Sequence, residues 1–354
     1  MENERVMKFD EFSLYKDFED IVIKIFKENN FKVEISAKDK YDFRAILENT
    51  FCYVEVKHYS NKLPKLDLLK TACNRLLSQK DNEFAKLILV VSSYVTPSLQ
   101  QDIFKEFGVI IWDIKTLFSL SFDYADTYYE LQNILVKSFK SSVDEFSIID
   151  NDFKKQIVPN LVQSSTNAKS KPLSHKGKRL CHDLNALSSG NTDATLYENK
   201  CIEILKYLFD NNTDLTLWRR QLSSDDGLNR FDLLCRIISY NNTFWTELAT
   251  DFHTRYVVFE FKNYTDPIKQ GQIFTTEKYL FLTALRSVSF IIARVGADIN
   301  AIKASKGALK EAGKLIVILQ NSDICDMLAL KDNGDEPSIV LRNKIDEMLI
   351  TLNR

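Results

Sequence analysis

The chain has 354 residues, of which 45% are apolar and 27% are charged, with a formal net charge of −2. This composition is that of an ordinary soluble globular protein, and the length favours two domains over one hydrophobic core. The near-neutral charge excludes a globally basic nucleic-acid-binding protein, so any such surface has to be a local patch.

Several common functional classes lack their sequence signals. No run of 18 apolar residues is present and the N-terminus is charged from its second residue, which predicts a cytoplasmic protein without a membrane span. The six cysteines form no C-x-x-C pair and lie mostly in apolar runs, and the four histidines are scattered. We therefore expect buried thiols in a reducing compartment, rather than disulfides or a zinc site.

The first part of the chain reads as an α/β domain. Residues 15–27 carry apolar side chains at the spacing of an amphipathic helix, and two asparagines follow it. Candidate strands at about 41–47 and 51–57 come next, and a helix over 64–77 opens with a proline. Two short apolar runs, 86–93 and 108–114, have the length of buried strands and flank a short helix near 97–107.

A basic, polar stretch follows the first domain. Residues 153–179 contain seven lysines or arginines and no acid. The stretch predicts either a solvated linker or a strap that becomes ordered on nucleic acid. We therefore place an N-terminal domain at 1–140, a linker at 141–175 and a C-terminal domain at 176–354. Lys176, Lys178 and Arg179 are candidate phosphate contacts.

The order of elements then repeats. Residues 197–209 predict a helix, 230–237 and 255–262 two strands, and 266–286 a turn and helix. Buried strands are expected at 287–294 and 314–320, with a helix between them. Two halves of similar order indicate a duplication or two related modules.

Each half contains the triplet E-x-K on a predicted strand, as Glu55-x-Lys57 and Glu260-x-Lys262. Strand side chains alternate, so the carboxylate and the ammonium share one face. Magnesium is held by one or two carboxylates and several waters, and a lysine beside it can act on the same water. The triplet alone is weak evidence, because about one or two arise by chance in a chain of this length. A third copy, Glu198-x-Lys200, falls on a helix, where residues two apart do not face each other.

The context of the triplets is more specific than the triplets themselves. Asp42 precedes the first on the neighbouring strand and Asp232 precedes the second in the same way. Glu19 and Glu198 occupy matching places on the amphipathic helix upstream. A helix glutamate, a strand aspartate, E-x-K and a following helix therefore recur in one order.

With these motifs, residues 10–120 and 175–320 resemble the PD-(D/E)xK nuclease superfamily, in its restriction-endonuclease-like, Mrr-type branch. Tyr41 and Phe231 stand where the motif's proline would be. The resemblance implies that the Asp and the Glu bind Mg²⁺ (or Mn²⁺), that the lysine activates water and that the helix glutamate supports the site. The implied catalytic residues are Asp42, Glu55 and Lys57 in the first copy and Asp232, Glu260 and Lys262 in the second.

Simpler interpretations remain open for these residues. Each Glu and Lys pair could be a solvated strand face, and a glutamate in a first helical turn is favoured by the helix dipole. Gln270 could reach the second site or only begin a helix. Arg219 and Arg220, beside Trp218, could contact phosphates or lie on a surface strand.

The expected fold is α/β, with two restriction-endonuclease-like domains that each contain a central mixed β-sheet flanked by helices. The resemblance implies a Mg²⁺-dependent endonuclease that acts on DNA, in restriction or anti-phage defence. One alternative is that only the C-terminal module cuts while the N-terminal module recognises DNA or a partner. Another is an inactive nuclease fold that binds nucleic acid or acts as a scaffold. No Walker A loop is present, so activation would require a separate activator, sensor or ATPase subunit, and a homo-oligomer is possible.

Overall fold

A computed structural model describes residues 10–35, 41–80, 82, 84–146, 150–163, 175–210, 214–223, 230–238 and 244–352. The chain divides into two compact units. The first comprises Met1–Ser174 with Asn333–Glu336, and the second comprises His175–Asp332 with Pro337–Arg354. The division predicted from sequence has its boundaries at 140 and 175 and assigns no later segment to the first domain.

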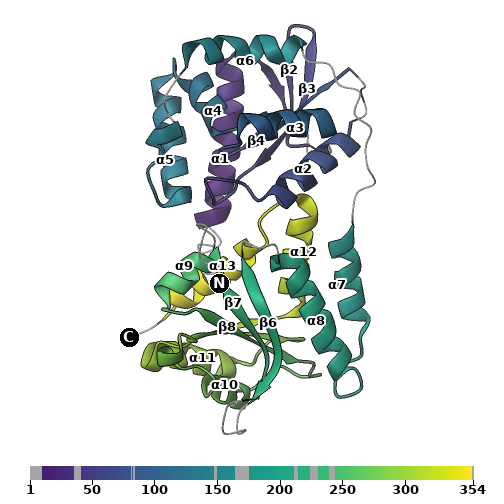
Figure 1. The fold of residues 1–354 in the computed structure, drawn as a ribbon, viewed down its shortest axis with the longest axis vertical. Coiled ribbons are helices and arrows are strands. Elements are labelled where there is room, and N and C mark those ends of the chain that lie inside the picture. The colour runs from purple at the N-terminus through teal and green to yellow at the C-terminus, as the bar shows by residue number, and fades with distance from the viewer. Residues whose placement is uncertain are drawn as a thin grey trace. The chain divides into compact units, whose positions relative to one another are not determined.

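The first unit is built on a five-stranded mixed sheet in the order β1-β2-β3-β4-β5 (Figure 1). β1 pairs with β2 and β2 with β3 in antiparallel fashion, whereas β3, β4 and β5 are parallel. The strands are β1 (Lys32–Glu34), β2 (Phe43–Leu47), β3 (Thr50–Lys57), β4 (Lys86–Val91) and β5 (Val109–Trp112).

Helices cover both faces of this sheet. α1 (Asp10–Glu28), α4 (Ile114–Ser121) and α5 (Ala125–Phe139) share one apolar cluster with the sheet, and α2 (Leu66–Ser78) and α3 (Pro97–Phe107) share another. α1 folds as predicted because its stripe of Phe18, Ile21, Val22 and Ile25 is fully buried. Its C-terminus is followed by Asn30 in the left-handed region, at φ 65°.

Part of the stretch expected to be a linker is helical. α6 (Asn151–Gln163) belongs to the first unit, where Ile157 and Leu161 are buried against its core. Two apolar residues one turn apart in a basic segment were too weak a pattern to predict this helix. Residues 164–174, the middle of the suggested strap, lie outside the described residues.

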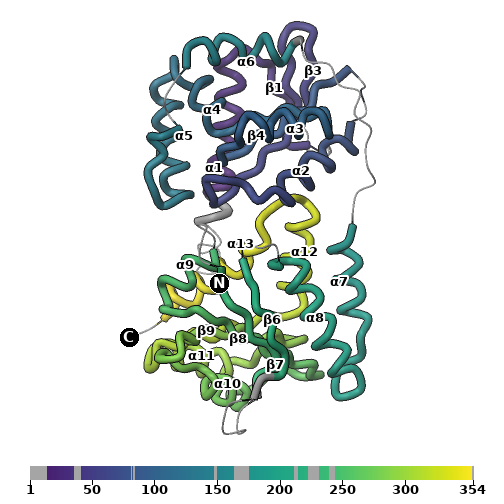
Figure 2. The backbone as a smooth tube through the Cα atoms, viewed as in Figure 1, coloured from purple at the N-terminus to yellow at the C-terminus, as the bar shows by residue number. Residues whose placement is uncertain are grey.

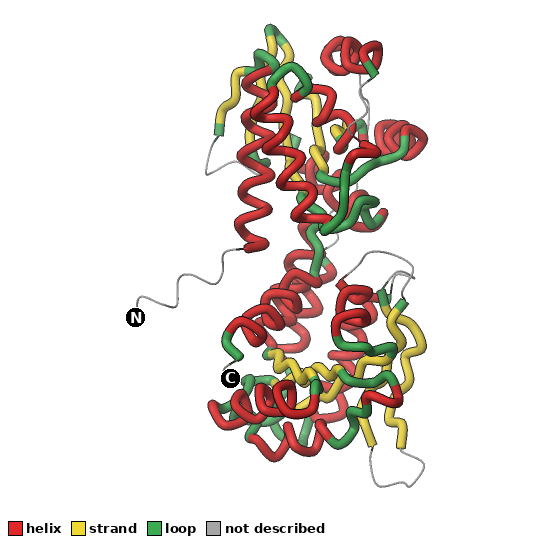
Figure 3. Tube along the Cα trace, turned by 90° about the vertical axis from the view of Figure 1, so that its left-hand side faces the viewer, coloured by secondary structure: helices red, strands yellow, loops and turns green. Residues whose placement is uncertain are grey.

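The second unit repeats the sheet in the order β6-β7-β8-β9-β10, with the same change from antiparallel to parallel pairing at its central strand. Figure 2 traces the backbone of this unit, and Figure 3 shows its strands between helices. The strands are β6 (Leu215–Ser223), β7 (Arg230–Ile237), β8 (Tyr256–Lys262), β9 (Val288–Ala293) and β10 (Leu315–Leu319).

The helices of the second unit are again divided between the two faces of the sheet. One apolar cluster contains α7 (Lys176–Ala186), α8 (Ala194–Phe209), α9 (Phe244–Asp251), α12 (Asn321–Asn333) and α13 (Ser338–Ile350). The other contains α10 (Gln270–Glu277) and α11 (Ile299–Ala312). α9 lies in the long excursion between the strands that carry Asp232 and Glu260.

The predicted fold class is confirmed. The structure has two five-stranded mixed sheets flanked by helices, consistent with two restriction-endonuclease-like domains. Both E-x-K triplets lie at the end of the central strand, β3 or β8. The third triplet lies on α8, as expected. Within the described part of the chain, no helix has both the length and the apolar character needed to cross a membrane.

The prediction of free thiols was wrong for two cysteines. Cys181 on α7 and Cys325 on α12 form a disulfide, with their Cα atoms 5.2 Å apart. They are separated by 144 residues in sequence, so only the packing of the two helices brings them together. The other four cysteines are buried and free.

Two helical glycines provide a test of packing in the second unit. A Cβ on Gly177 of α7 would come within 2.5 Å of the Leu328 carbonyl oxygen, whereas a Cβ on Gly307 of α11 would meet nothing within 4 Å. We expect Gly177→Ala to destabilise the unit by about 1–3 kcal/mol through overpacking. Gly307→Ala should stabilise it by about 0.5–1 kcal/mol through helix propensity. Thermal denaturation of both variants checks this, and an unchanged or raised midpoint for Gly177→Ala would contradict the packing.

Candidate nuclease sites

The second unit brings Asp232, Glu260 and Lys262 together. Antiparallel pairing of β7 with β8 places Asp232 beside the E-x-K triplet. One carboxylate oxygen of Asp232 (Oδ2) accepts a hydrogen bond from the backbone N–H of Phe261, the middle residue of the triplet, at 2.9 Å. The Lys262 ammonium lies 2.8 Å from Glu260 Oε2 and 3.7 Å from Asp232 Oδ2. The Asp232 N–H in turn donates to Glu260 Oε1 at 3.3 Å.

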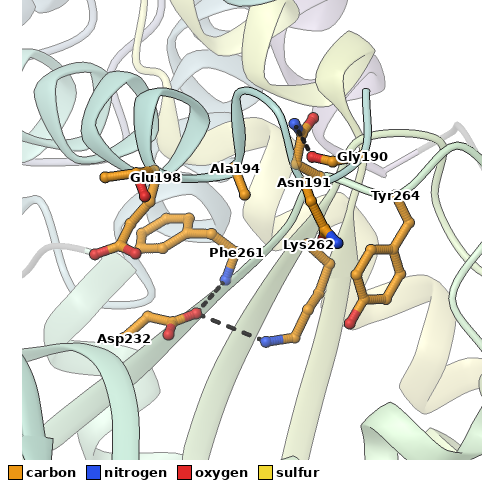
Figure 4. Close-up of a pocket in the computed structure, with 10 residues that line it drawn as sticks. Gly190, Asn191, Ala194, Glu198, Asp232, Phe261, Lys262 and Tyr264 are labelled. Atoms are coloured by element: carbon orange, nitrogen blue, oxygen red, sulfur yellow. Dashed lines mark hydrogen bonds and ion pairs between the residues drawn. The ribbon is translucent and has the colours of Figure 1, made fainter. Parts of the chain in front are cut away.

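Two of these three side chains, Asp232 and Lys262 but not Glu260, border an open pocket of about 180 Å³. Asp232 and Lys262 line it from the sheet, and Glu198 extends toward Asp232 from α8 (Figure 4). Figure 4 also shows Tyr264 on the side of Lys262 away from Asp232. The remaining lining residues are Gly190, Asn191, Ala194, Thr195, Phe261 and Asn263. The pocket therefore joins a lysine and two carboxylates at a place that a substrate can reach.

Burial and neighbouring charges together shift the pKa values of this site. Burial, with a further contribution from Asp232, raises the pKa of Glu260 to about 7, although Lys262 acts in the opposite direction. Burial alone would lower the pKa of Lys262, but Glu260 and Asp232 outweigh it and the pKa lies above its ordinary value. Lys262 is therefore an ammonium at neutral pH, and it can donate to an anion or a water but cannot accept a proton.

The donor set fits a small hard cation. Within the described ranges no three His, Cys, Asp or Glu side chains gather as metal ligands. Magnesium, however, needs only one or two carboxylates, with waters and substrate phosphate completing its shell. Asp232 and Glu260 provide two carboxylates joined through the backbone, and Glu198 lines the same pocket. These residues would hold Mg²⁺ or Mn²⁺.

The first unit repeats the central contact. Asp42 Oδ2 accepts a hydrogen bond of 2.6 Å from the N–H of Val56, the middle residue of its triplet. Lys57 Nζ lies 3.2 Å from Glu55 Oε1. Glu19 of α1 is close enough that its charge contributes to the raised pKa of Asp42. Burial and then Glu55 are the larger causes, and the pKa of Asp42 is about 7.

The first site is closed, unlike the second. The Lys57 side chain is only 4% exposed, against 19% for Lys262, whereas the two glutamates are equally buried, Glu55 at 3% and Glu260 at 4%. Asp335 of the Asn333–Glu336 segment, which belongs to the first unit, lies 3.0 Å from Lys57 Nζ. Arg75 Nη1 of α2 lies 3.6 Å from Glu55. Both charges of the triplet therefore already have partners from the same unit.

The structure places the other candidates in different ways. Arg220 on β6 lies 3.3 Å from Glu198, at the wall of the pocket, and Arg219 beside it is exposed. Gln270, the first residue of α10, is exposed and is not among the pocket's lining residues. The basic side chains at the start of α7 are also exposed and outside the lining: Lys176, Lys178 and Arg179.

Sequence reasoning missed several residues around both sites. Asn263 and Tyr264 directly follow the second triplet, so adjacency to the motif could have indicated them. Gly190 and Asn191 lie in an S-S-G-N turn before α8, which carried no chemical signal. Arg75 and Asp335 are distant from the first triplet in sequence, and only tertiary structure reveals their ion pairs.

Comparison with known proteins supports a restriction-endonuclease-like fold for the first unit. Residues 10–121, about a third of the chain, match an Mrr-type family model described as restriction endonuclease. A solved structure, that of the restriction endonuclease FokI, aligns with a TM-score of 0.32 and 9% identity. The alignment covers 77% of this chain and 51% of that one, so the chain spans about half of FokI's length. A search of curated proteins found no match.

The raised pKa of Glu260 predicts that metal binding to the second site strengthens with pH. The metal competes with the proton, so affinity for Mn²⁺ should be about tenfold weaker at about pH 6 than at about pH 8. Titration calorimetry on the chain with Asp42→Asn, which removes the first site, measures this. Glu260→Gln in the same background should bind more weakly and lose most of the dependence, whereas equal affinity at both pH values for the parent would contradict the assignment.

Proposed function

We propose that this protein is a metal-dependent endonuclease that hydrolyses phosphodiester bonds of DNA, and that cleavage occurs in the second unit. The observation that carries the proposal is the pocket in which Lys262 and Asp232 are reachable and Glu198 adds a second carboxylate, with the buried Glu260 2.8 Å from Lys262. The match of residues 10–121 to a restriction endonuclease family supports the nuclease class and the choice of DNA.

The residues of the second unit divide the chemistry among them. Asp232 and Glu260 would hold the metal, which when bound would polarise the scissile phosphate and the attacking water. Lys262 approaches the same place as a cation, so it would donate to a phosphate oxygen or to the water and stabilise the negative charge that develops. Phe261, through its backbone N–H, holds Asp232 in register with both.

DNA contact is proposed along the edge of the second sheet. β6 is an edge strand, and it presents Arg219 and Arg220 to solvent beside α8. Arg220 is bound to Glu198 and Asn199, so its guanidinium stands next to the pocket that receives the scissile phosphate. Arginine binds phosphate through its fork of donors. Lys176, Lys178 and Arg179 on α7 remain further candidate contacts.

The first unit is proposed to recognise DNA or a partner rather than to cut. Its lysine and glutamate are buried and paired with Asp335 and Arg75, so a phosphate would have to displace existing ion pairs to reach them. A role in restriction or anti-phage defence, with a separate activator, sensor or ATPase subunit, is proposed from the family resemblance alone. The rival function, a DNA-binding scaffold on an inactive nuclease fold, would use the same surfaces without cleavage.

Substitution of the two lysines tests this division. With Mg²⁺ or Mn²⁺ and supercoiled plasmid, we expect Lys262→Ala to reduce the cleavage rate by about 100- to 1000-fold, because a donor to the developing charge is lost. Lys57→Ala should leave the rate close to that of the parent. Circular dichroism must show both variants folded, since each substitution leaves a buried carboxylate without its counter-charge.

Three outcomes would count against the proposal. Cleavage by Lys262→Ala at the parental rate would exclude the mechanism. Loss of cleavage in Lys57→Ala alone would move the activity to the first unit. Binding of plasmid without any cleavage, with linear duplex, single strands and RNA also uncut, would favour the scaffold.

A further inference from the structure

Two residues that directly follow strands of the sheet hold the turn between α7 and α8. This turn, residues 187–193, carries Gly190 and Asn191 of the pocket wall and leads into α8, where Glu198 lies in the second turn. Asn263 follows the catalytic strand β8 directly and is 5% exposed. Arg294 follows the neighbouring strand β9, and its N–H donates to the Lys262 carbonyl at 3.0 Å.

The side-chain amide and the backbone carbonyl of Asn263 both bind the turn or Arg294. Its amide Nδ2 donates to the carbonyls of Ser188 at 2.8 Å and Gly190 at 3.1 Å. Its own carbonyl accepts from the N–H of Gly190 at 2.6 Å. Its Oδ1 accepts from Arg294 Nη1 at 3.0 Å. A buried amide with every group satisfied in this way fixes one geometry of its neighbours.

Arg294 binds the end of α7 and the start of the turn. Its Nη2 donates to the carbonyls of Leu187 at 2.5 Å and Asn185 at 3.2 Å. The guanidinium also lies 5.9 Å from the ring centre of Tyr197, one residue before Glu198 on α8. The two residues thus bind the end of α7 and the turn that follows it, at Asn185, Leu187, Ser188 and Gly190.

From this geometry we infer that Asn263 and Arg294 are positioning residues of the second site, which hold α8 so that Glu198 faces Asp232 across the pocket. The inference rests on the proposed nuclease function and goes beyond it, because Arg294 does not line the pocket and Asn263, which does, binds the turn and Arg294 with its side chain. The arrangement belongs to the second unit. At the equivalent position after the first triplet stands His58, whose Nε2 instead pairs with Ser138 Oγ at 2.7 Å.

The inference makes a quantitative prediction for plasmid cleavage by the full-length protein. Asn263→Ala should lower kcat by about 10- to 100-fold, the usual effect of losing a residue that orients a ligand, with KM changed far less. Arg294→Lys, which keeps the charge but loses the fork, should lower kcat in the same direction. Thr250→Ala, which removes an exposed hydroxyl bonded only within α9, is the matched control and should leave kcat unchanged.

A double-mutant cycle separates positioning from general destabilisation. If Asn263 acts through Glu198, then Asn263→Ala combined with Glu198→Gln should be no slower than the slower single variant. If the reductions in cleavage rate of the two single variants multiply in the double variant, the inference is overturned, because Asn263 and Glu198 would then act independently.

Hydrogen exchange provides a test that does not depend on activity. Amide exchange of peptides covering 187–193 should speed up at least about tenfold in Asn263→Ala, since the Gly190 N–H loses the geometry of its acceptor, and not in Thr250→Ala. Unchanged exchange would overturn the inference whatever the cleavage assay gives. If exchange is faster in Asn263→Ala but Lys262→Ala cleaves at the parental rate, the nuclease proposal is contradicted. The role of Asn263 in holding the turn would still stand.

Discussion

A hydrogen bond from the backbone to an aspartate organises each candidate site. The N–H of the middle residue of E-x-K, Phe261 or Val56, donates to the carboxylate of an aspartate, Asp232 on β7 or Asp42 directly before β2. This residue's side chain points to the opposite face from the glutamate and the lysine, so its amide lies between them. The bond therefore fixes the aspartate relative to both charged side chains, and it explains why the motif needs a neighbouring antiparallel strand at a defined register.

The two units then differ in what surrounds the same core geometry. In the first, Arg75 and Asp335 neutralise Glu55 and Lys57 inside the protein, where removal of a single partner is costly. In the second, Lys262 and Asp232 border a pocket, and the wall opposite is set by a turn that Asn263 and Arg294 hold. Two units with the same sheet order can thus keep one set of charged side chains buried and paired while the other borders a pocket.

Much of the architecture could be predicted from sequence because it depends on local patterns. The α1 stripe, the buried runs of β4 and β9 and the alternation around both triplets indicated the helices and strands of two α/β domains, and the family resemblance implied that each sheet is mixed. The α6 helix, the Cys181–Cys325 disulfide and the partners of Lys57 could not be predicted, because each arises from contacts between distant segments. Nothing in the sequence indicated that Lys57 would be buried and Lys262 reachable.

The central claim is that the second unit holds the metal that cuts DNA while the first does not. Crystals grown with Mn²⁺ and a short DNA duplex, measured for anomalous scattering, test this most directly. The account predicts a manganese peak within bonding distance of Asp232 and Glu260, beside a DNA phosphate, and no peak between Asp42 and Glu55. A peak at the first pair alone, or a phosphate bound there in place of Asp335, would contradict it.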